Sequence, residues 1–241
     1  METRVNKFLS EAGFCSRREA DRLIDEKRVT VNDKVPEKGL KVTDGDIVKV
    51  DGNIISKSVL PIYIALNKPV GIVSTTDHTI EENIVDFLNH PKRLFHVGRL
   101  DKASEGLIFM TNDGDIVNKI LRAGNFHEKE YIVEVDKEIT PAFLAMMRKG
   151  VPILDTTTKS CKVEKVDEYK FNIILTEGLN RQIRRMCDYL GYKVKSLKRI
   201  RIMNVHLDVK TGSWRYLTNE EIEGLNKLVN SSIKTEDASK W

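Results

Sequence analysis

The sequence contains no long hydrophobic run. No stretch of its 241 residues approaches the roughly 18 apolar residues that a membrane span needs. Residues 1–5 also lack the apolar core of a signal peptide. The three cysteines, Cys15, Cys161 and Cys187, stand far apart with no CxxC pair, which argues against a disulfide framework and a structural zinc site. We therefore expect a cytoplasmic protein whose cysteines are buried or half-buried free thiols.

Motifs for cofactors and metals are also missing. The sequence has no P-loop, no GxGxxG after a strand and no HExxH. Its five histidines are scattered without the spacing of metal ligands: His78, His90, His96, His127 and His206. With 40% hydrophobic residues and a net charge of +4, the chain suits a globular protein that can bind a polyanion but need not. We expect neither a cofactor nor a metal.

The first 54 residues predict a small module of two helices and a few short strands. Val5, Phe8 and Leu9 follow helical spacing up to Gly13. Ser16 and Glu19 form a capping box for a second helix, and strands are expected at 29–31 and 47–50. One face of the second helix is basic and carries Arg17, Arg18 and Arg22. Such a face is either simply solvated or contacts phosphates.

A second domain is expected at residues 62–230, after a linker at 55–61 and before a frayed tail at 231–241. Strand patterns occur at 62–66, 106–111, 131–135, 161–166, 171–175, 194–205 and 214–217. Helices are expected from Asp113 to Gly124, after the cap Thr140, from the cap Asn180 to about Leu190, and after the capping box Thr218–Glu221. The mixture shows no regular βαβ rhythm, so we predict an α+β fold.

The stretch from His96 to Leu107 combines turn residues with clustered charge. Gly98 and Gly106 permit turns that other residues resist. Asp101 stands between the cations Arg99 and Lys102, where a carboxylate stays ionised and can act as nucleophile or base. An aspartate in such a loop can equally well cap a backbone turn, and spacing alone does not decide between the two.

Several ordered motifs resemble those of the RNA pseudouridine synthases, in particular the RsuA family and its branch that modifies large-subunit ribosomal RNA. The loop motif is Gly98-Arg99-Leu100-Asp101, with Ser104 and Gly106-Leu107 behind it. Further shared stretches are 66–75, 128–131 and 178–186. The likeness covers nearly the whole chain, and the N-terminal module resembles the S4 RNA-binding module.

This resemblance implies a catalytic domain with a central, mostly antiparallel sheet and an active cleft across it. It also implies an isomerase that breaks the N1–C1′ bond of a flipped uridine and reattaches the base through C5, without a cofactor. Asp101 is then the catalytic carboxylate and Arg184 its partner. Tyr131 stacks on the base, and Ile183 lies beneath its ring.

Other residues receive roles with the alternatives left open. Arg181 or Arg185 could pair with Asp101 in place of Arg184, or bind phosphate. Arg99 resembles the arginine that fills the stack vacated by the flipped nucleotide. An isolated strand tyrosine such as Tyr131 more often packs in a core. The basic residues from Lys193 to Arg201 indicate either an RNA-facing strand edge or a solvated one.

The expected partner is ribosomal RNA, with the large subunit favoured and tRNA as the other candidate, and we expect a monomer. A non-catalytic RNA-binding or ribosome-assembly protein of the same architecture is the alternative, and it would be expected to lose Asp101. A glycosidase-like hydrolase would need a second carboxylate across the cleft.

Overall fold

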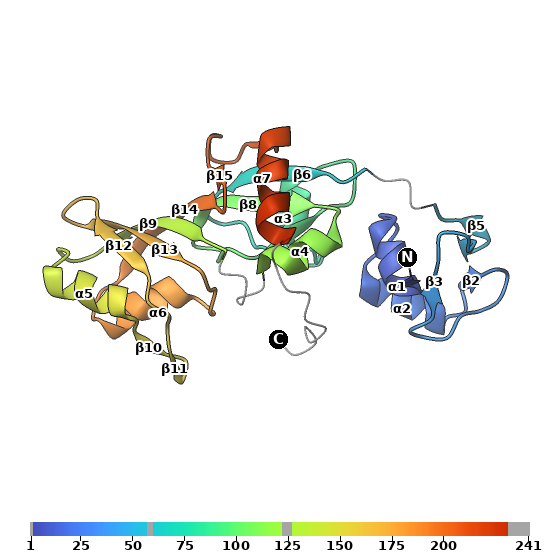
Figure 1. Ribbon diagram of the computed structural model, residues 1–241, viewed down its shortest axis with the longest axis horizontal. Helices are drawn as coiled ribbons and strands as arrows, with labels where there is room; N and C mark the ends of the chain where they lie inside the picture. The colour runs from blue at the N-terminus through green and yellow to red at the C-terminus, as the bar shows by residue number, and fades with distance from the viewer. Residues whose placement is uncertain (1, 57–59, 122–126, 231–241) are drawn as a thin grey trace. The chain divides into compact units, whose positions relative to one another are not determined.

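The computed structural model describes residues 2–56, 60–121 and 127–230 (Figure 1). The predicted tail at 231–241, residues 57–59 of the predicted linker and the predicted helix end at Gly124 lie outside these ranges. Contacts divide the chain into two compact units, one of Met1–Ile62 with His90–Leu94 and Asn112–Gly114, and one of the remaining residues. No helix of the described ranges has the length and apolar character needed to cross a membrane.

The first unit contains two helices and two small sheets. These are α1 (Val5–Glu11), α2 (Arg17–Asp25), the pair β1 (Thr3–Arg4) with β3 (Lys41–Val42), and the set β2 (Val29–Val31), β4 (Val48–Val50) and β5 (Asn53–Ile54). The predicted cap is confirmed, since Ser16 Oγ accepts a hydrogen bond of 3.1 Å from Glu19 N. The apolar faces of both helices are buried with the strands in one core, which includes Leu9, Ala20, Leu23 and Val29.

The second unit is built on one nine-stranded sheet. Its strand order is β12 (Lys162–Lys165), β13 (Lys170–Leu175), β9 (Lys129–Val135), β14 (Val194–Ile202), β8 (Glu105–Thr111), β6 (Tyr63–Lys68) and β16 (Trp214–Tyr216). In addition, β15 (Val205–His206) pairs with β14 and β7 (Phe95–Val97) pairs with β8. Among the described strands, only β14 and β8 run parallel within this sheet. The prediction of a mixed, mostly antiparallel sheet is therefore confirmed.

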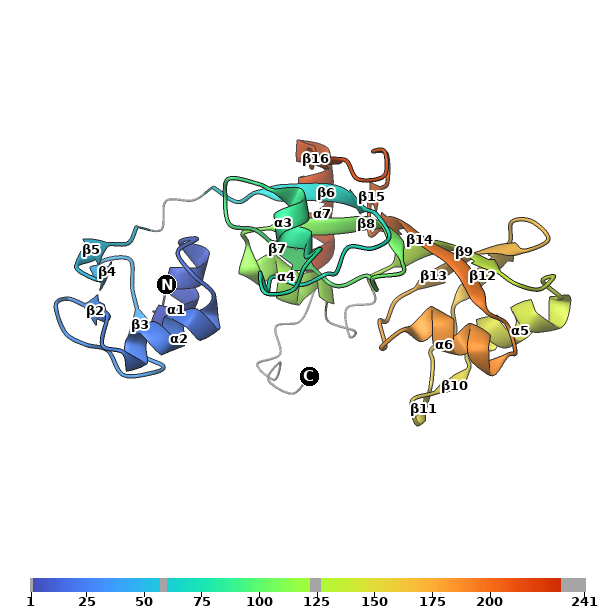
Figure 2. The ribbon, with the colours of Figure 1, turned by 180° about the vertical axis from the view of Figure 1, so that it is seen from behind.

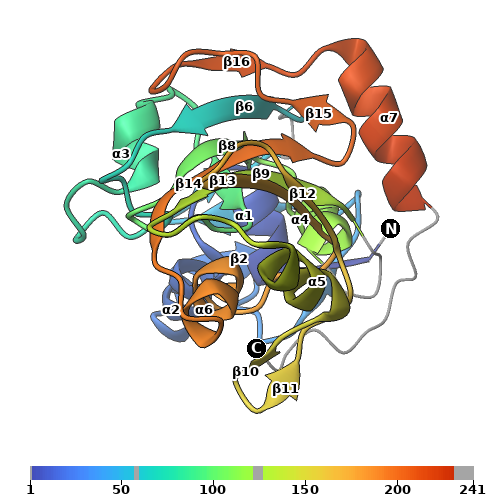
Figure 3. The same ribbon diagram turned by 90° about the vertical axis from the view of Figure 1, so that its left-hand side faces the viewer.

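Helices cover both halves of this sheet. They are α3 (Ile84–Leu88), α4 (Gly114–Leu121), α5 (Pro141–Lys149), α6 (Gln182–Tyr189) and α7 (Asn219–Asn230), with a hairpin of β10 (Pro152–Ile153) and β11 (Thr156–Thr157). Figures 2 and 3 show α5 and α6 on one side of β9, β12 and β13. Ile116 and Ile120 of α4 and Leu225 of α7 share a core with Leu107 and Phe109 of β8.

Caps were predicted from the sequence for three helices of this unit, and the prediction is confirmed at two of them. Thr140 Oγ1 accepts from Phe143 N at 3.1 Å, and Thr218 and Glu221 bond to each other's backbone N–H. At α6 the prediction is wrong, because the cap position belongs to Arg181 in the left-handed conformation and not to Asn180. The Asn180 side chain instead accepts from the Arg185 guanidinium at 3.1 Å.

The basic stretch from Lys193 to Arg201 was predicted to form a strand edge, and this is wrong for its second half, where Lys198 and Arg199 also pair with β8. It lies mostly in β14, which has β9 on one side and β8 on the other. Arg199 is buried, and Arg201 forms ion pairs with Glu128 at 2.9 Å and Glu130 at 2.6 Å. Carboxylates on the neighbouring strand compensate a cation that would otherwise be costly inside a sheet.

Gly106 has a different role from the turn that its sequence context suggested. It lies within β8, with φ at +112°, beside residue 199 of β14. A Cβ atom at this position would overlap the backbone of Arg199. Glycine is therefore needed here because β14 approaches β8 too closely for any side chain.

We expect Gly106→Ala to lower the free energy of unfolding by about 3 kcal/mol or more, because it adds both backbone strain and an overlap between strands. Urea unfolding of the variant measures the change. Gly178→Ala is the matched control, since its new Cβ would meet no atom within 4 Å. Equal stabilities of the two variants would contradict this explanation.

Candidate active site

Asp101 lies in the loop between β7 and β8. Gly98, with φ at +73°, turns the chain after β7. Ser104 N then donates a hydrogen bond of 3.0 Å to Asp101 O, which closes a tight turn just before β8. The Asp101 side chain is 34% exposed, so a ligand can reach the carboxylate while the loop itself is held by the strands on either side.

Two arginines from the start of α6 reach this carboxylate. Arg184 Nε lies 3.7 Å and Arg181 Nη1 lies 4.0 Å from Asp101 Oδ2. The Arg184 side chain is only 11% exposed, whereas that of Arg181 is 50% exposed. Arg185 instead donates to Asn180 O at 3.0 Å and to its side chain. Of the three candidates, Arg184 is the closest and the most buried.

Arg184 also holds the backbone of the Asp101 loop. Its Nη2 donates to Ala103 O at 2.9 Å and to Ser104 Oγ at 3.1 Å. Its Nε is buried and has no hydrogen-bond partner among the described residues. Burial lowers the pKa of the Arg184 guanidinium, and the Asp101 carboxylate opposes that shift. One guanidinium therefore both anchors the loop and faces its carboxylate.

The cations that flank Asp101 in the sequence do not pair with it. Lys102 Nζ lies 2.6 Å from Glu82 Oε2 in an exposed ion pair. Arg99 is exposed. The positive charge next to the carboxylate thus comes from α6, about 80 residues later in the chain.

Tyr131 belongs to a row of residues that crosses four strands. It pairs with Arg199 of β14, which pairs with Gly106 of β8, which pairs with Lys68 of β6. Paired residues point to the same face of a sheet, and two strand spacings place Tyr131 roughly 10 Å from Gly106. Gly106 is the second residue of β8. Tyr131 therefore lies in the row where the Asp101 loop enters the sheet.

Ile183 precedes Arg184 on α6 and is buried at 5% exposure. Tyr131 is 9% exposed. Both side chains therefore belong to the interior of the second unit, while the carboxylate and Arg181 reach its surface. The acid is thus accessible, whereas the side chains of Tyr131 and Ile183 are largely covered.

Lys68 and Arg199 are two buried cations of the second unit. From the sequence, Lys68 had no assigned role and Arg199 was expected at a strand edge. The Lys68 side chain is fully buried, and its Nζ donates to Pro69 O and Ile72 O, each at 2.8 Å. Burial lowers the pKa of Lys68 to about 8, an effect that Asp101 opposes and Arg199 reinforces. Arg199 Nε donates to Leu107 O at 2.6 Å.

A signal for Lys68 was available, because residues 64, 66 and 68 alternate along one buried face of β6. A lysine that continues a buried apolar series is unusual enough to mark a site.

Neither the cysteines nor the histidines add a reactive centre to this site. The three cysteines are free, with Cys15 and Cys187 buried and Cys161 half-buried, as predicted. Burial raises the pKa of Cys15 and of Cys161 to about 11 and that of Cys187 to about 12. All three thiols are therefore poor nucleophiles at neutral pH. Within the described ranges, no group of three or more His, Cys, Asp or Glu residues is placed to hold a metal ion.

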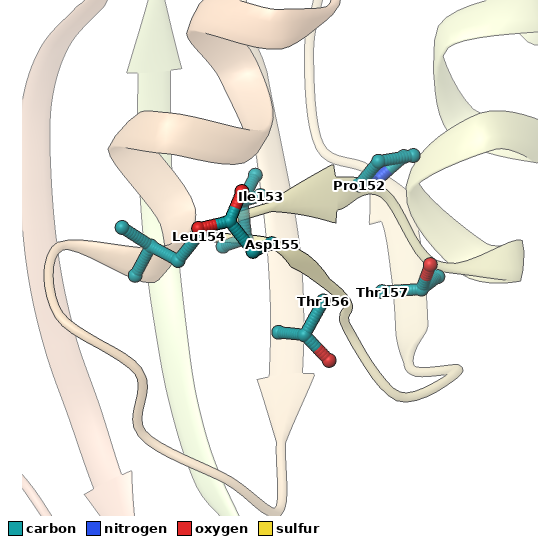
Figure 4. Close-up of a pocket in the computed structure, with 6 residues that line it drawn as sticks. All are labelled: Pro152, Ile153, Leu154, Asp155, Thr156 and Thr157. Carbon is teal, nitrogen blue, oxygen red and sulfur yellow. The ribbon is translucent and has the colours of Figure 1, made fainter.

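A shallow hollow is formed at the β10–β11 hairpin by residues 152–157 (Figure 4). Its polar side chains are Asp155 and two threonines, and none of the predicted site residues lines it. This hollow is therefore not part of the candidate site around Asp101.

The arginines of the first unit differ in how far their charge is neutralised. Arg22 forms ion pairs with Glu19 at 2.5 Å and Glu26 at 3.8 Å. Arg17 and Arg18 are exposed at the start of α2, and no ion pair is described for either of them. These two are therefore the most accessible cations of α2 for an anionic partner.

Family models match both units. Residues 62–189 match the model for RNA pseudouridylate synthase, and residues 3–48 match that for the S4 domain. The first match contains Asp101, Tyr131, Ile183 and Arg184.

Individual proteins extend this similarity over nearly the whole chain. The chain is 58% identical over 233 residues to the dual-specificity RNA pseudouridine synthase RluF of Salmonella typhi, covering 95% of this chain and 81% of the relative. It is 35% identical over 236 residues to the ribosomal large subunit pseudouridine synthase B of Bacillus subtilis, covering 93% and 96%. A crystal structure of a pseudouridylate synthase superposes with a TM-score of 0.68 at 29% identity, covering 92% of this chain and 99% of the other.

The buried Lys68 predicts a measurable pH dependence of stability. Its lowered pKa means that the unfolded chain binds the proton more tightly than the folded chain does. Above about pH 10.4, the pKa of a lysine in an unfolded chain, Lys68 is neutral in both states and the free energy of unfolding is at its highest with respect to this group. This contribution is lost as the pH falls through about 8, where Lys68 takes up a proton in the folded state. The free energy of unfolding is measured in urea for the wild type and for Lys68→Met at pH 6.5, 8 and 9.5. We expect the value of the wild type to rise relative to that of the variant as the pH rises. A constant difference would refute this.

Proposed function

The chain belongs to the RNA pseudouridylate synthases, the isomerases that convert uridine to pseudouridine in RNA, and from this premise we propose that it modifies a specific uridine of large-subunit ribosomal RNA. The observation that carries the proposed site is the accessible Asp101 carboxylate facing the guanidinium of the half-buried Arg184 at 3.7 Å. The family's reaction needs one such acid, placed against the sugar of a flipped nucleoside.

Asp101 is the proposed catalytic carboxylate. Cleavage of the N1–C1′ bond builds positive charge on the sugar, and the carboxylate stabilises it, attacks C1′ or removes the C2′ proton. The freed uracil then turns and C5 bonds to C1′. This step releases the carboxylate if it had attacked C1′, or is accompanied by return of the proton to C2′ if that proton had been removed. The C5 proton is then lost and N1 takes up a proton, so the net change is an isomerisation. Arg184 orients the acid, because its Nη2 is bonded to the same loop that carries Asp101.

The remaining site residues handle the base and the backbone of the RNA. Tyr131 stacks on the flipped uracil, and Ile183 supports its ring from α6. Arg99, exposed beside Asp101, fills the stack that the nucleotide leaves. Arg181, half exposed at the mouth of the site, contacts a flanking phosphate or supports Asp101.

The S4 domain supplies most of the RNA affinity in this proposal. Arg17, Arg18 and Arg22 of α2 contact phosphates, with Arg22 in competition with its carboxylate partners. The N-terminal module spans residues 1–54 and the catalytic domain residues 62–230, and the protein acts as a cytoplasmic monomer without a cofactor.

A second RNA target is favoured by one specific observation. The relatives that are 57 to 58% identical to this chain are named dual-specificity RNA pseudouridine synthases. We therefore extend the proposal to tRNA as a second substrate class. Mapping of pseudouridine across total RNA in cells with and without the protein identifies both targets. If ribosomal RNA positions are unchanged, the ribosomal assignment is wrong.

We expect Asp101→Asn to abolish isomerisation, because the amide keeps the shape of the side chain but removes its charge and basicity. RNA affinity should stay within about twofold, since phosphate contacts dominate it. Single-turnover assays and binding measurements on the same RNA test both points. Asp155→Asn is the control, because it makes the same change at the β10–β11 turn. Retained activity of the Asp101 variant would overturn the catalytic assignment.

Replacing Arg17 and Arg18 together by alanine should weaken RNA binding and reduce the slope of log affinity against log salt by about 1.5, as expected for two lost phosphate contacts. Arg22→Ala should change the slope less, because Glu19 and Glu26 already neutralise this guanidinium. Binding titrations at several salt concentrations measure the slopes. An unchanged slope in the double variant would show that α2 does not touch phosphate.

A further inference from the structure

The backbone on both sides of Asp101 is tied to one neighbouring segment, residues 69–74. Before Asp101, Leu100 N donates to Ser74 Oγ at 3.2 Å, and Ser74 Oγ donates to Leu100 O at 2.9 Å. After Asp101, Gly71 N donates to Lys102 O at 2.8 Å. Three hydrogen bonds therefore fix the two residues adjacent to the catalytic carboxylate.

The bonds of Ser74 are well protected from water. Ser74 is 4% exposed and Leu100 is 7% exposed. A serine hydroxyl has one donor and two acceptor positions, and here the donor and one acceptor position both serve the same residue. Removal of the hydroxyl would leave a buried N–H and a buried C=O of Leu100 without these partners.

The segment that carries Ser74 is itself held in place. Lys68 Nζ bonds to the carbonyls of Pro69 and Ile72. Val73 N donates to Glu82 O and Ile84 N donates to Val73 O, each at 2.9 Å. Residues 69–74 therefore form a fixed support and not a free loop.

The other side of the loop is supported by Arg184, which bonds to Ala103 and Ser104. The Asp101 loop is thus hydrogen-bonded to two separate parts of the chain, α6 and the segment after β6. Arg184 touches the carboxylate region directly, whereas Ser74 contacts only the backbone at Leu100.

We propose that Ser74 is a positioning residue for the isomerisation, one that fixes the backbone at Leu100 and thereby the direction of the Asp101 carboxylate. This inference rests on the proposed catalytic role of Asp101. Its physical reason is that a displacement of about 1 Å in a reacting group can cost about 100-fold in rate. Ser74 does not contact the RNA in this proposal, so its loss should slow the chemistry and leave binding unchanged.

The test compares Ser74→Ala with Thr158→Ala. Thr158 is 3% exposed, and its Oγ1 accepts from the buried Val151 N at 2.9 Å, so its removal breaks the same kind of buried hydrogen bond near the β10–β11 hairpin. Single-turnover rates at saturating enzyme, RNA dissociation constants and thermal midpoints are measured for both full-length variants. We expect Ser74→Ala to lower the rate about 10- to 100-fold with the dissociation constant within twofold, and Thr158→Ala to keep the wild-type rate.

A second variant, Ser74→Cys, nearly preserves the side-chain volume but has a poor hydrogen-bonding group. It keeps the test decisive if Ser74→Ala fails to fold, and its rate should also fall. A wild-type rate for either Ser74 variant, or equal rate losses for Ser74→Ala and Thr158→Ala, would overturn the proposal. Failure of the proposed function is distinguishable, because in that case Asp101→Asn itself would remain active.

Discussion

The contact between the Asp101 carboxylate and the Arg184 guanidinium is the interaction on which the site depends. At 3.7 Å it is longer than a charge-assisted hydrogen bond of about 2.8 Å, and the buried Arg184 Nε has no hydrogen-bond partner within the ranges that the structure describes. Arg184 is held through its Nη2 by the Asp101 loop, so the pair cannot separate without breaking backbone contacts. Catalytic hydrogen bonds are often long in ligand-free sites and shorten when substrate binds, and an approach of under 1 Å would satisfy both groups.

This contact requires the whole topology of the second unit. Asp101 precedes β8, Arg184 belongs to α6 and Tyr131 to β9. The strand that joins them in space is β14, which runs parallel to β8 and antiparallel to β9. Gly106 permits the close approach of β14 to β8, because any Cβ there would overlap Arg199. Gly106 is thus needed for the pairing of β8 with β14, through which the start of β8 and Tyr131 of β9 lie in one row of the sheet.

The sequence was sufficient for many of the local elements. The caps at Ser16 and Thr140 follow local rules, and the structure contains both. The cap of α6 was assigned to Asn180 instead of Arg181. Arg181 adopts a left-handed conformation that is common for asparagine and glycine but not for arginine, so its sequence position gave no sign of a cap. The second half of the stretch 193–201 was misjudged because alternating charge resembles an exposed edge, and the carboxylates that neutralise Arg201 lie about 70 residues earlier in the chain. Local patterns carry no information on such distant partners.

Two cations of the second unit, Lys68 and Arg199, depart from the usual rule that charged side chains are exposed. A fully buried lysine and a buried arginine lie in one row of the sheet with Tyr131, although burying such cations without a carboxylate partner is costly. Lys68 is held by carbonyl oxygens alone, and its lowered pKa reflects that cost. Stability alone would favour apolar residues at both positions. These two residues keep positive charge in the interior of a domain whose family acts on RNA, and a positive field of this kind favours a polyanionic substrate.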